Sequence, residues 1–233
     1  MLNNFFTFTP NGNGTDIIHQ FWVVVLVIVG IVSILQMKGK NRKFEVFMGI
    51  TLATFLLVYH GWYAINPNNV FITKGLPLYH CSISAIIQSY YLITGRKPDL
   101  ILKDANAIAL GGAIFGILFP TAFNHQFAFP HLMHIGNFGI HALFILVGVY
   151  YIWVRNVRLS KKEYWNCIKI LAIWDIVIHI FNRFVGTNYS FVNSCPFKWL
   201  PFSPVVELLA CFLIFCLGYW IEYKLIPYKE EKE

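Results

Sequence analysis

The chain has 233 residues, of which 57% are hydrophobic and 12% are charged, and its formal net charge is +7. Soluble domains contain about 25% charged residues, so this composition excludes an ordinary soluble globule and also a disordered chain. The apolar residues are too many to be hidden in one core of this size, and the surplus is expected to face lipid.

Seven largely apolar stretches follow one another along the chain, and a helix of about 20 such residues crosses a bilayer. They cover residues 17–37, 45–64, 76–94, 105–123, 131–153, 164–185 and 204–224. The polar leader before them has no basic segment and no small-residue cleavage site, so a cleaved signal is not expected. We predict an all-α, polytopic membrane protein whose residues 1–233 form one seven-helix bundle.

The basic residues predict how this bundle is oriented. Of the 18 Lys and Arg, 14 lie in the connections after the first, third and fifth spans and in the C-terminal tail, whereas three lie on the opposite side. Cytoplasmic loops are enriched in Lys and Arg. We therefore expect an N-terminus outside, a C-terminus in the cytoplasm and a multi-pass location in the cell membrane. Anionic lipid accounts for the positive charge, and no nucleic-acid partner is expected.

Polar side chains within the spans gather in the half that this topology places outside. They come from five spans: His60; His80, Cys81, Ser84 and Gln88; His131, His134, Asn137 and His141; Asp175, His179, Asn182 and Arg183; and Glu207. Such residues usually face the bundle interior or a wet cavity. We expect one polar cavity that opens toward the outer side. A structural ion pair between Asp175 and Arg183 is an alternative role for these two residues.

Two local patterns predict details of the packing. The string GAIFG at 112–116 permits a close contact between helices. Pro130 suits the first turn of the fifth span, where a missing N–H group is tolerated.

Cys81 is the candidate nucleophile among five cysteines. It lies in the string LPLYHCSI, near an outer helix N-terminus whose partial positive charge favours a thiolate. His141 and His134 are candidate bases at matching depth, whereas His80 points about 100° away from Cys81 around the helix. Spacing alone also allows a disulfide from Cys81 to Cys195, or inert packing of the thiol.

Three strings carry a resemblance to a known family: LPLYHCSI, HIGNFGIHALFILVGVYYI and GTNYSFV. They resemble motifs of the YwaF family of small bacterial integral membrane proteins, over about residues 45–220. That family is similar to animal multi-pass proteins that transfer fatty acyl groups onto ether phospholipids through a Cys/His pair. The resemblance implies that this pair is Cys81 and His141. The family's LPLH-C pattern differs here, because Tyr79 and His80 both precede Cys81.

We therefore predict a membrane acyltransferase that acts on phospholipid acyl chains at the outer side of the bilayer, without a cofactor. His141 would act as general base toward Cys81, and the resulting thioester would pass its acyl group to a lysophospholipid. The predicted oxyanion or supporting groups are His80, His134, Asn137, Asp175, His179 and Asn182. The predicted head-group cations are Arg183 and Lys198.

Other functions stay open. The same thioester could end on water, which would make the protein a Cys–His lipid hydrolase. A zinc-dependent hydrolase would draw tetrahedral ligands from His60, His131, His134, His179 or Asp175, although no span has the H-x-x-x-H spacing. A non-enzymatic transporter or receptor is the third alternative, without internal symmetry to favour it. The oligomeric state does not follow from the sequence.

Overall fold

A computed structural model of the chain describes residues 5–9, 17–118 and 127–193, together with seven separate positions between 212 and 224. These residues form helices, turns and connections, and no strand occurs among them. The predicted all-α class is therefore confirmed for this part of the chain.

The described α-helices occupy six of the seven predicted spans. They are α2 (Ile17–Leu35), α3 (Arg42–Ala64), α4 (His80–Thr94), α5 (Leu100–Leu118), α7 (Leu132–Trp153) and α8 (Lys161–Val185). Two short helical turns, η1 (Phe71–Gly75) and η2 (Tyr189–Phe191), follow α3 and α8. The seventh predicted span, 204–224, lies outside the described residues except for the separate positions.

Three helices in the described part of the chain are long and apolar enough to cross a membrane: Ile18–Leu35, Arg42–Ala64 and Leu132–Trp153. The chain is therefore a membrane protein. The seven crossings and their orientation stay predictions.

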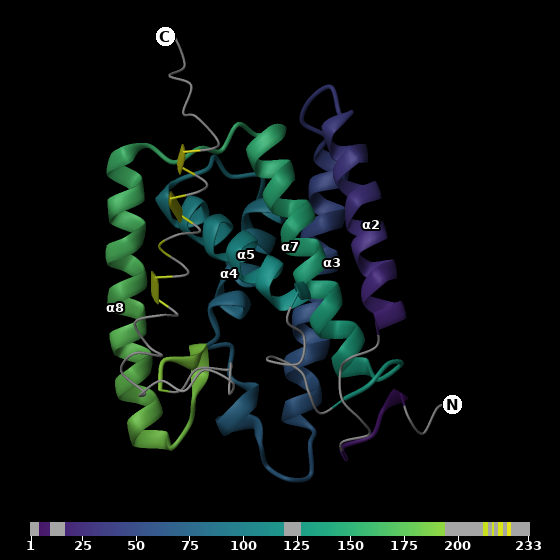
Figure 1. Ribbon diagram of the computed structural model, residues 1–233, viewed down its shortest axis with the longest axis vertical. Helices are drawn as coiled ribbons and strands as arrows, with labels where there is room; N and C mark the ends of the chain where they lie inside the picture. The colour runs from purple at the N-terminus through teal and green to yellow at the C-terminus, as the bar shows by residue number, and fades with distance from the viewer. Residues whose placement is uncertain are drawn as a thin grey trace.

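The helix α7 lies inside the bundle and packs against α2, α3 and α5 (Figure 1). The helix α4 packs against α3 and α5, so α3, α4, α5 and α7 enclose a common interior. The helix α8 stands at the edge opposite α2 and contacts α5 and η2. This arrangement brings the starts of α4 and α7 and the end of α8 toward one end of the bundle (Figure 1).

Local sequence explains where α7 and α8 begin. Ser160 and Glu163 form a capping box: the Glu163 N–H donates to Ser160 Oγ, and the Ser160 N–H donates to Glu163 Oε2. His131 caps α7 by accepting a hydrogen bond from the Met133 N–H. The prediction that Pro130 lies in the first turn of this helix is wrong, because α7 begins only at Leu132.

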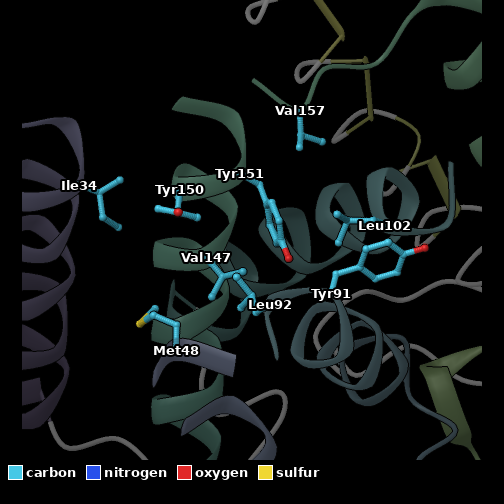
Figure 2. Close-up of a cluster of buried hydrophobic side chains, with 9 residues drawn as sticks. All are labelled: Ile34, Met48, Tyr91, Leu92, Leu102, Val147, Tyr150, Tyr151 and Val157. Carbon is cyan, nitrogen blue, oxygen red and sulfur yellow. The ribbon is translucent and has the colours of Figure 1, made fainter. Parts of the chain in front are cut away.

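A core of aromatic and aliphatic side chains fills the end of the bundle where α3 begins and α7 ends. Figure 2 shows its buried members: Ile34, Met48, Tyr91, Leu92, Leu102, Val147, Tyr150, Tyr151 and Val157. They come from α2, α3, α4, α5 and α7 and from the connection after α7. This core joins the helices around α7 at the end of the bundle where α3 begins and α7 ends.

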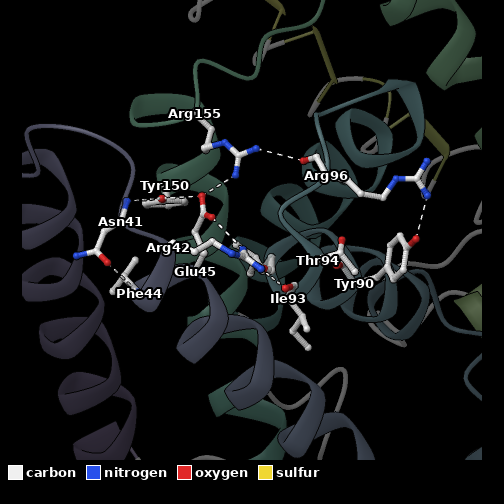
Figure 3. Close-up of polar contacts among 11 residues, drawn as sticks. Asn41, Arg42, Phe44, Glu45, Tyr90, Ile93, Thr94, Arg96, Tyr150 and Arg155 are labelled. Atoms are coloured by element: carbon white, nitrogen blue, oxygen red, sulfur yellow. Dashed lines mark hydrogen bonds and ion pairs between the residues drawn. The ribbon is translucent and has the colours of Figure 1, made fainter.

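A buried carboxylate lies beside this core (Figure 3). Glu45 is fully buried and accepts hydrogen bonds from Arg42, Arg155 and the Tyr150 hydroxyl. Arg42 also donates to the carbonyl of Leu92 at the end of α4. Two arginines that serve as topology signals in the sequence thus hold α3, α4 and α7 together.

Candidate functional site

Cys81 is the second residue of α4, and its thiol is free. Tyr79, which directly precedes the helix, is the N-cap but makes no side-chain capping hydrogen bond. The thiol is partly buried and packs against a buried cluster that includes Leu52 of α3, Ala85 of α4 and Phe144 of α7. The disulfide alternative is not realised at Cys81, and Cys195 lies outside the described residues.

Two of the three motif strings meet beside this helix start. The Tyr189 hydroxyl accepts a hydrogen bond from the Leu76 N–H at 3.0 Å, and Ser190 Oγ donates to the Leu78 carbonyl at 2.9 Å. The rings of Tyr79 and Tyr189 are in edge contact, with centroids 5.0 Å apart. GTNYSFV therefore braces LPLYHCSI immediately before Cys81, although more than 100 residues separate them.

Asn182 holds the bracing segment in place. Its Nδ2 donates to the Tyr189 carbonyl, and its Oδ1 accepts from the Tyr189 N–H and from the Thr187 hydroxyl. Gly186 makes the turn between them possible, because its φ of 72° lies in the left-handed region. These three hydrogen bonds order the turn, and the oxyanion role of Asn182 stays a prediction.

His141 lies on the third motif string, in the middle of α7. Its Nδ1 is 2.7 Å from the carbonyl oxygen of Asn137, which can only accept, so Nδ1 carries the hydrogen. The ring packs directly on Gly116 of α5, where a Cβ would lie 2.5 Å from Cδ2 of the ring. The close contact predicted for GAIFG is therefore confirmed at Gly116. Nothing lies within 4 Å of a Cβ at Gly112.

Cys81 and His141 approach the same interior from α4 and α7. The thiol packs on a cluster formed by α3, α4, α5 and α7, and the His141 ring lies in edge contact with Phe144 of that cluster at 6.1 Å. Both residues are described, and no hydrogen bond joins them. Catalytic hydrogen bonds are often longer without substrate, so the Cys81–His141 pair stays a prediction.

The imidazole next to Cys81 faces another helix. His80 Nε2 lies 2.9 Å from Asp175 Oδ1, and both side chains are buried between α4 and α8. A mostly apolar cavity of about 150 Å³ adjoins His80, with Ser84 and Asp104 among its lining residues. His80 points away from Cys81, as predicted. Asp175 pairs with His80, and the alternative pair of Asp175 with Arg183 is not formed.

Several of the remaining predicted polar residues have contacts away from Cys81 or no partner. His134 contacts the Phe127 carbonyl at 3.1 Å and His19 Nδ1 at 2.9 Å, toward α2. The Asn137 amide nitrogen and His179 Nδ1 are buried without a protein hydrogen-bond partner. Arg183 is exposed at the end of α8, and Lys198 lies outside the described residues.

The zinc alternative receives no support from the described residues. Within residues 5–9, 17–118, 127–193 and the separate positions, no three His, Cys, Asp or Glu side chains lie close enough to hold a metal. His131 instead contacts the Thr7 carbonyl at 2.9 Å, and His60 contacts the Gly75 carbonyl at 2.7 Å.

The sequence interpretation missed one contact near Cys81. His60 Nε2, at the end of α3, lies 3.1 Å from the hydroxyl of Ser82, the residue after Cys81. The sequence places His60 among the polar residues of the expected cavity and among the candidate metal ligands, without a partner beside Cys81. The order of the predicted spans points to this contact. Consecutive spans run antiparallel, so the end of the second span lies beside the start of the third.

The fold and these contacts define an α-helical membrane protein with a free thiol near the start of α4, just after a segment that the distant string GTNYSFV braces. The chain belongs to the TMEM164 family, whose sequence profile matches residues 12–221. A phospho-N-acetylmuramoyl-pentapeptide-transferase of Clostridium beijerinckii is 32% identical over 108 residues, which are 46% of this chain and 30% of that relative. The chain thus spans less than a third of the length of that relative. No solved structure matches the chain.

Proposed function

We propose that this protein is a membrane acyltransferase that moves fatty acyl groups between phospholipids through a thioester on Cys81. The TMEM164 family match agrees with the motif resemblance to Cys/His acyltransferases of ether phospholipids. The partial relative in Clostridium is itself named a transferase. The observation that carries the proposal is the convergence of motif residues on the first turn of α4, where Tyr189 and Ser190 brace the segment that leads into Cys81.

The first half of the reaction would transfer the acyl group to sulfur. The Cys81 thiol loses its proton to a base, and the thiolate attacks the ester carbonyl of a phospholipid. The ester C–O bond breaks, a C–S bond forms, and the departing lysophospholipid oxygen takes up a proton. In the second half, the hydroxyl of an acceptor lysophospholipid attacks the thioester, and the Cys81 thiolate departs and is reprotonated. His141 is the proposed base, because its Nδ1 hydrogen bond leaves Nε2 as the acceptor.

The start of α4 would stabilise the oxyanion that forms on the carbonyl. The backbone N–H groups of Cys81 and Ser82 lie in the first turn of α4. Such groups point along the helix axis toward its N-terminus and favour negative charge there. The exposed Arg183, with Lys198, remains the proposed partner of the lipid phosphate.

The test is acyl transfer by the purified full-length protein. The protein is reconstituted into phosphatidylcholine vesicles whose acyl chains carry an isotopic label, with an ether-linked lysophosphatidylethanolamine as acceptor. Mass spectrometry measures the labelled product and any acyl adduct on the Cys81 peptide. Cys81→Ala and His141→Gln are expected to abolish transfer. Cys216→Ala is the matched control, because it removes another partly buried free thiol and should leave transfer unchanged.

Two outcomes would change the conclusion. Transfer by Cys81→Ala at the wild-type rate contradicts the thioester mechanism. Labelled free fatty acid that forms at the same rate with and without the acceptor identifies a Cys81-dependent hydrolase in place of a transferase.

A further inference from the structure

The cavity beside His80 is an elongated slot between α4, α5 and α8. Its wall on α4 includes His80, Ile83 and Ile87, and its wall on α5 includes Ile101, Ala105 and Ile108. On both helices these residues recur every three or four positions, so each set forms a stripe along one helix face. A stripe of this length spans about 10 Å. The slot therefore runs along the helices and not across them.

One end of the slot lies at the start of α4. The Gln88 amide nitrogen of α4 donates to Asn106 Oδ1 of α5 at 3.1 Å, and the Tyr91 hydroxyl donates to Asp99 just before α5. These contacts show that the two helices are antiparallel. His80 therefore marks the end of the slot at the start of α4, and Ile101 marks the opposite end.

The end at His80 is next to the candidate nucleophile. His80 directly precedes Cys81, so their Cα atoms are about 3.8 Å apart. Their side chains point about 100° apart around α4, so the slot and the thiol lie on different faces of one helix turn. An oxyanion held by the N–H groups of this turn lies at the end of the helix axis, where both faces begin. A lipid carbonyl in that position is within reach of the thiol, and its chain can continue into the slot.

The other end of the slot opens on an apolar surface of the protein. Ile101 and Ile170 both line the slot and are 56% and 39% exposed, whereas Ala105 in its wall is 2% exposed. Exposed apolar side chains continue along α8 at Ile173 and Ile176. In a membrane protein such a surface contacts lipid hydrocarbon, so a lipid chain can pass from the bilayer into the slot.

The polar groups along the slot have partners in the protein. His80 Nε2 lies 2.9 Å from Asp175 Oδ1, and Asp104 Oδ1 accepts a hydrogen bond from the Tyr219 hydroxyl at 2.5 Å. Isoleucine, leucine and alanine side chains form most of the remaining wall. A long apolar wall with paired polar groups favours a hydrocarbon ligand over a charged one.

We propose that this slot holds the fatty acyl chain of the phospholipid while the ester carbonyl lies at the start of α4. The inference rests on the acyltransferase function proposed above and adds the part of the site that binds the chain. Ala105 and Ile108 are then specificity-determining residues, because they form the buried wall far from His80. A chain that is long enough to reach them gains burial of its methylene groups, and a short chain does not.

The first experiment locates the chain by photocrosslinking. The purified full-length protein is placed in nanodiscs that contain phosphatidylcholine with a diazirine at the middle of an octadecanoyl chain, and mass spectrometry maps the adducts. Adducts are expected on Ile87, Ala105 or Ile108 of the slot. Ile173 and Ile176 are the internal reference, because they are 63% and 61% exposed and bulk lipid reaches them.

Filling the slot should displace the chain. Ala105→Phe is expected to lower the adducts on Ile108 about 10-fold relative to the reference, which corresponds to lost burial of about two methylene groups. Ile87→Phe fills the slot from α4 at a half-buried position and should act in the same way. Ala107→Phe is the matched control, because it adds the same volume to α5 at a buried position that packs with Leu159 and Cys167. Melting temperatures verify that each variant is folded.

The second experiment measures acyl transfer from octadecanoyl and butanoyl phosphatidylcholine donors. A butanoyl chain is too short to reach Ala105. In Ala105→Phe and Ile87→Phe, the ratio of octadecanoyl to butanoyl transfer should fall about 10-fold, whereas Ala107→Phe should keep the wild-type ratio.

The outcomes separate the slot from the acyltransferase proposal. Adducts confined to Ile173 and Ile176, or slot adducts that both filling variants leave unchanged, overturn the slot. Slot labelling by a free diazirine fatty acid but not by the phospholipid also overturns it. Unchanged chain preference in both filling variants overturns the slot and leaves a Cys81-dependent transfer standing. Slot adducts at the wild-type level in Cys81→Ala support the slot even if no transfer product forms.

Discussion

The contact between Gly116 and His141 makes a sharp prediction about the site. An alanine Cβ at position 116 would lie 2.5 Å from Cδ2, 2.6 Å from Nε2 and 2.9 Å from Cγ of the His141 ring. The ring is flat and rigid, and its Nδ1 is tied to the Asn137 carbonyl at 2.7 Å. The ring cannot change its conformation as a flexible side chain would, so the His141 ring and α5 must move apart.

The size of the displacement follows from these distances. Ordinary contact begins at 3.4 Å, so the ring must move by about 0.9 Å. Overpacking of this kind costs about 1–3 kcal/mol of stability. A misplacement of about 1 Å at a reacting group lowers the rate by about 100-fold. Gly116→Ala should therefore reduce acyl transfer about 100-fold and lower the unfolding free energy by about 1–3 kcal/mol.

Gly112→Ala is the matched control, because it makes the same change one turn away with nothing within 4 Å of the new Cβ. It should keep wild-type transfer and gain up to about 1 kcal/mol from helix propensity. The assays are the labelled-lipid transfer described above and reversible unfolding in mixed micelles. The double variant Gly116→Ala, His141→Ala removes the ring and should recover the lost stability. Equal effects of the two glycine substitutions, or no recovery in the double variant, would refute the reasoning.

Three further predictions concern the frame around the site. Glu45→Ala leaves the buried guanidinium of Arg155 without its carboxylate and should lower the unfolding free energy by about 3–5 kcal/mol. A second substitution, Arg155→Met, should recover part of this loss. Full stability of the single variant would contradict the buried pair. Ser160→Ala removes the capping box of α8 and should cost about 1 kcal/mol, whereas Thr51→Ala, on the exposed face of α3, should cost less. Partial burial would raise the pKa of Asp99, but hydrogen bonds from the Tyr91 hydroxyl and the N–H groups of Leu102 and Ile101 hold it below its ordinary value. Its ionised form therefore adds stability above the ordinary pKa, and this contribution is lost as the pH falls through the lowered value. Melting temperatures across acidic pH should fall less steeply in Asp99→Asn, and an unchanged slope would count against this contribution.

The helices could be predicted from the sequence because their signal is local. Hydropathy over about 20 residues depends on neighbours along the chain, and six predicted spans coincide with helices. The start of α7 was misplaced because His131, and not Pro130, supplies the cap. Cap identity depends on one backbone conformation, which hydropathy does not report.

The partners of the polar residues could not be predicted in the same way. Whether His80 meets Asp175, or Ser82 meets His60, depends on which helices are neighbours and how each is rotated. Periodicity placed His80 and Cys81 on different faces correctly, but it could not say which helix each face meets. Asn182 shows the same limit, because its residue type suits an oxyanion hole equally well as a turn. The approach of Tyr189 and Thr187 shows the part of Asn182 in the turn, which its residue type alone does not.

The phenol of Tyr189 has a consequence for how a lipid could reach the thiol. It accepts from the Leu76 N–H and donates to the Ile72 carbonyl, so one ring fastens the link after α8 to the link before α4. A ligand that pushed these two links apart would have to replace both hydrogen bonds. The connections before α4 and after α8 are therefore expected to stay together at this end of the bundle. An acyl chain would instead enter laterally from the bilayer, between helices.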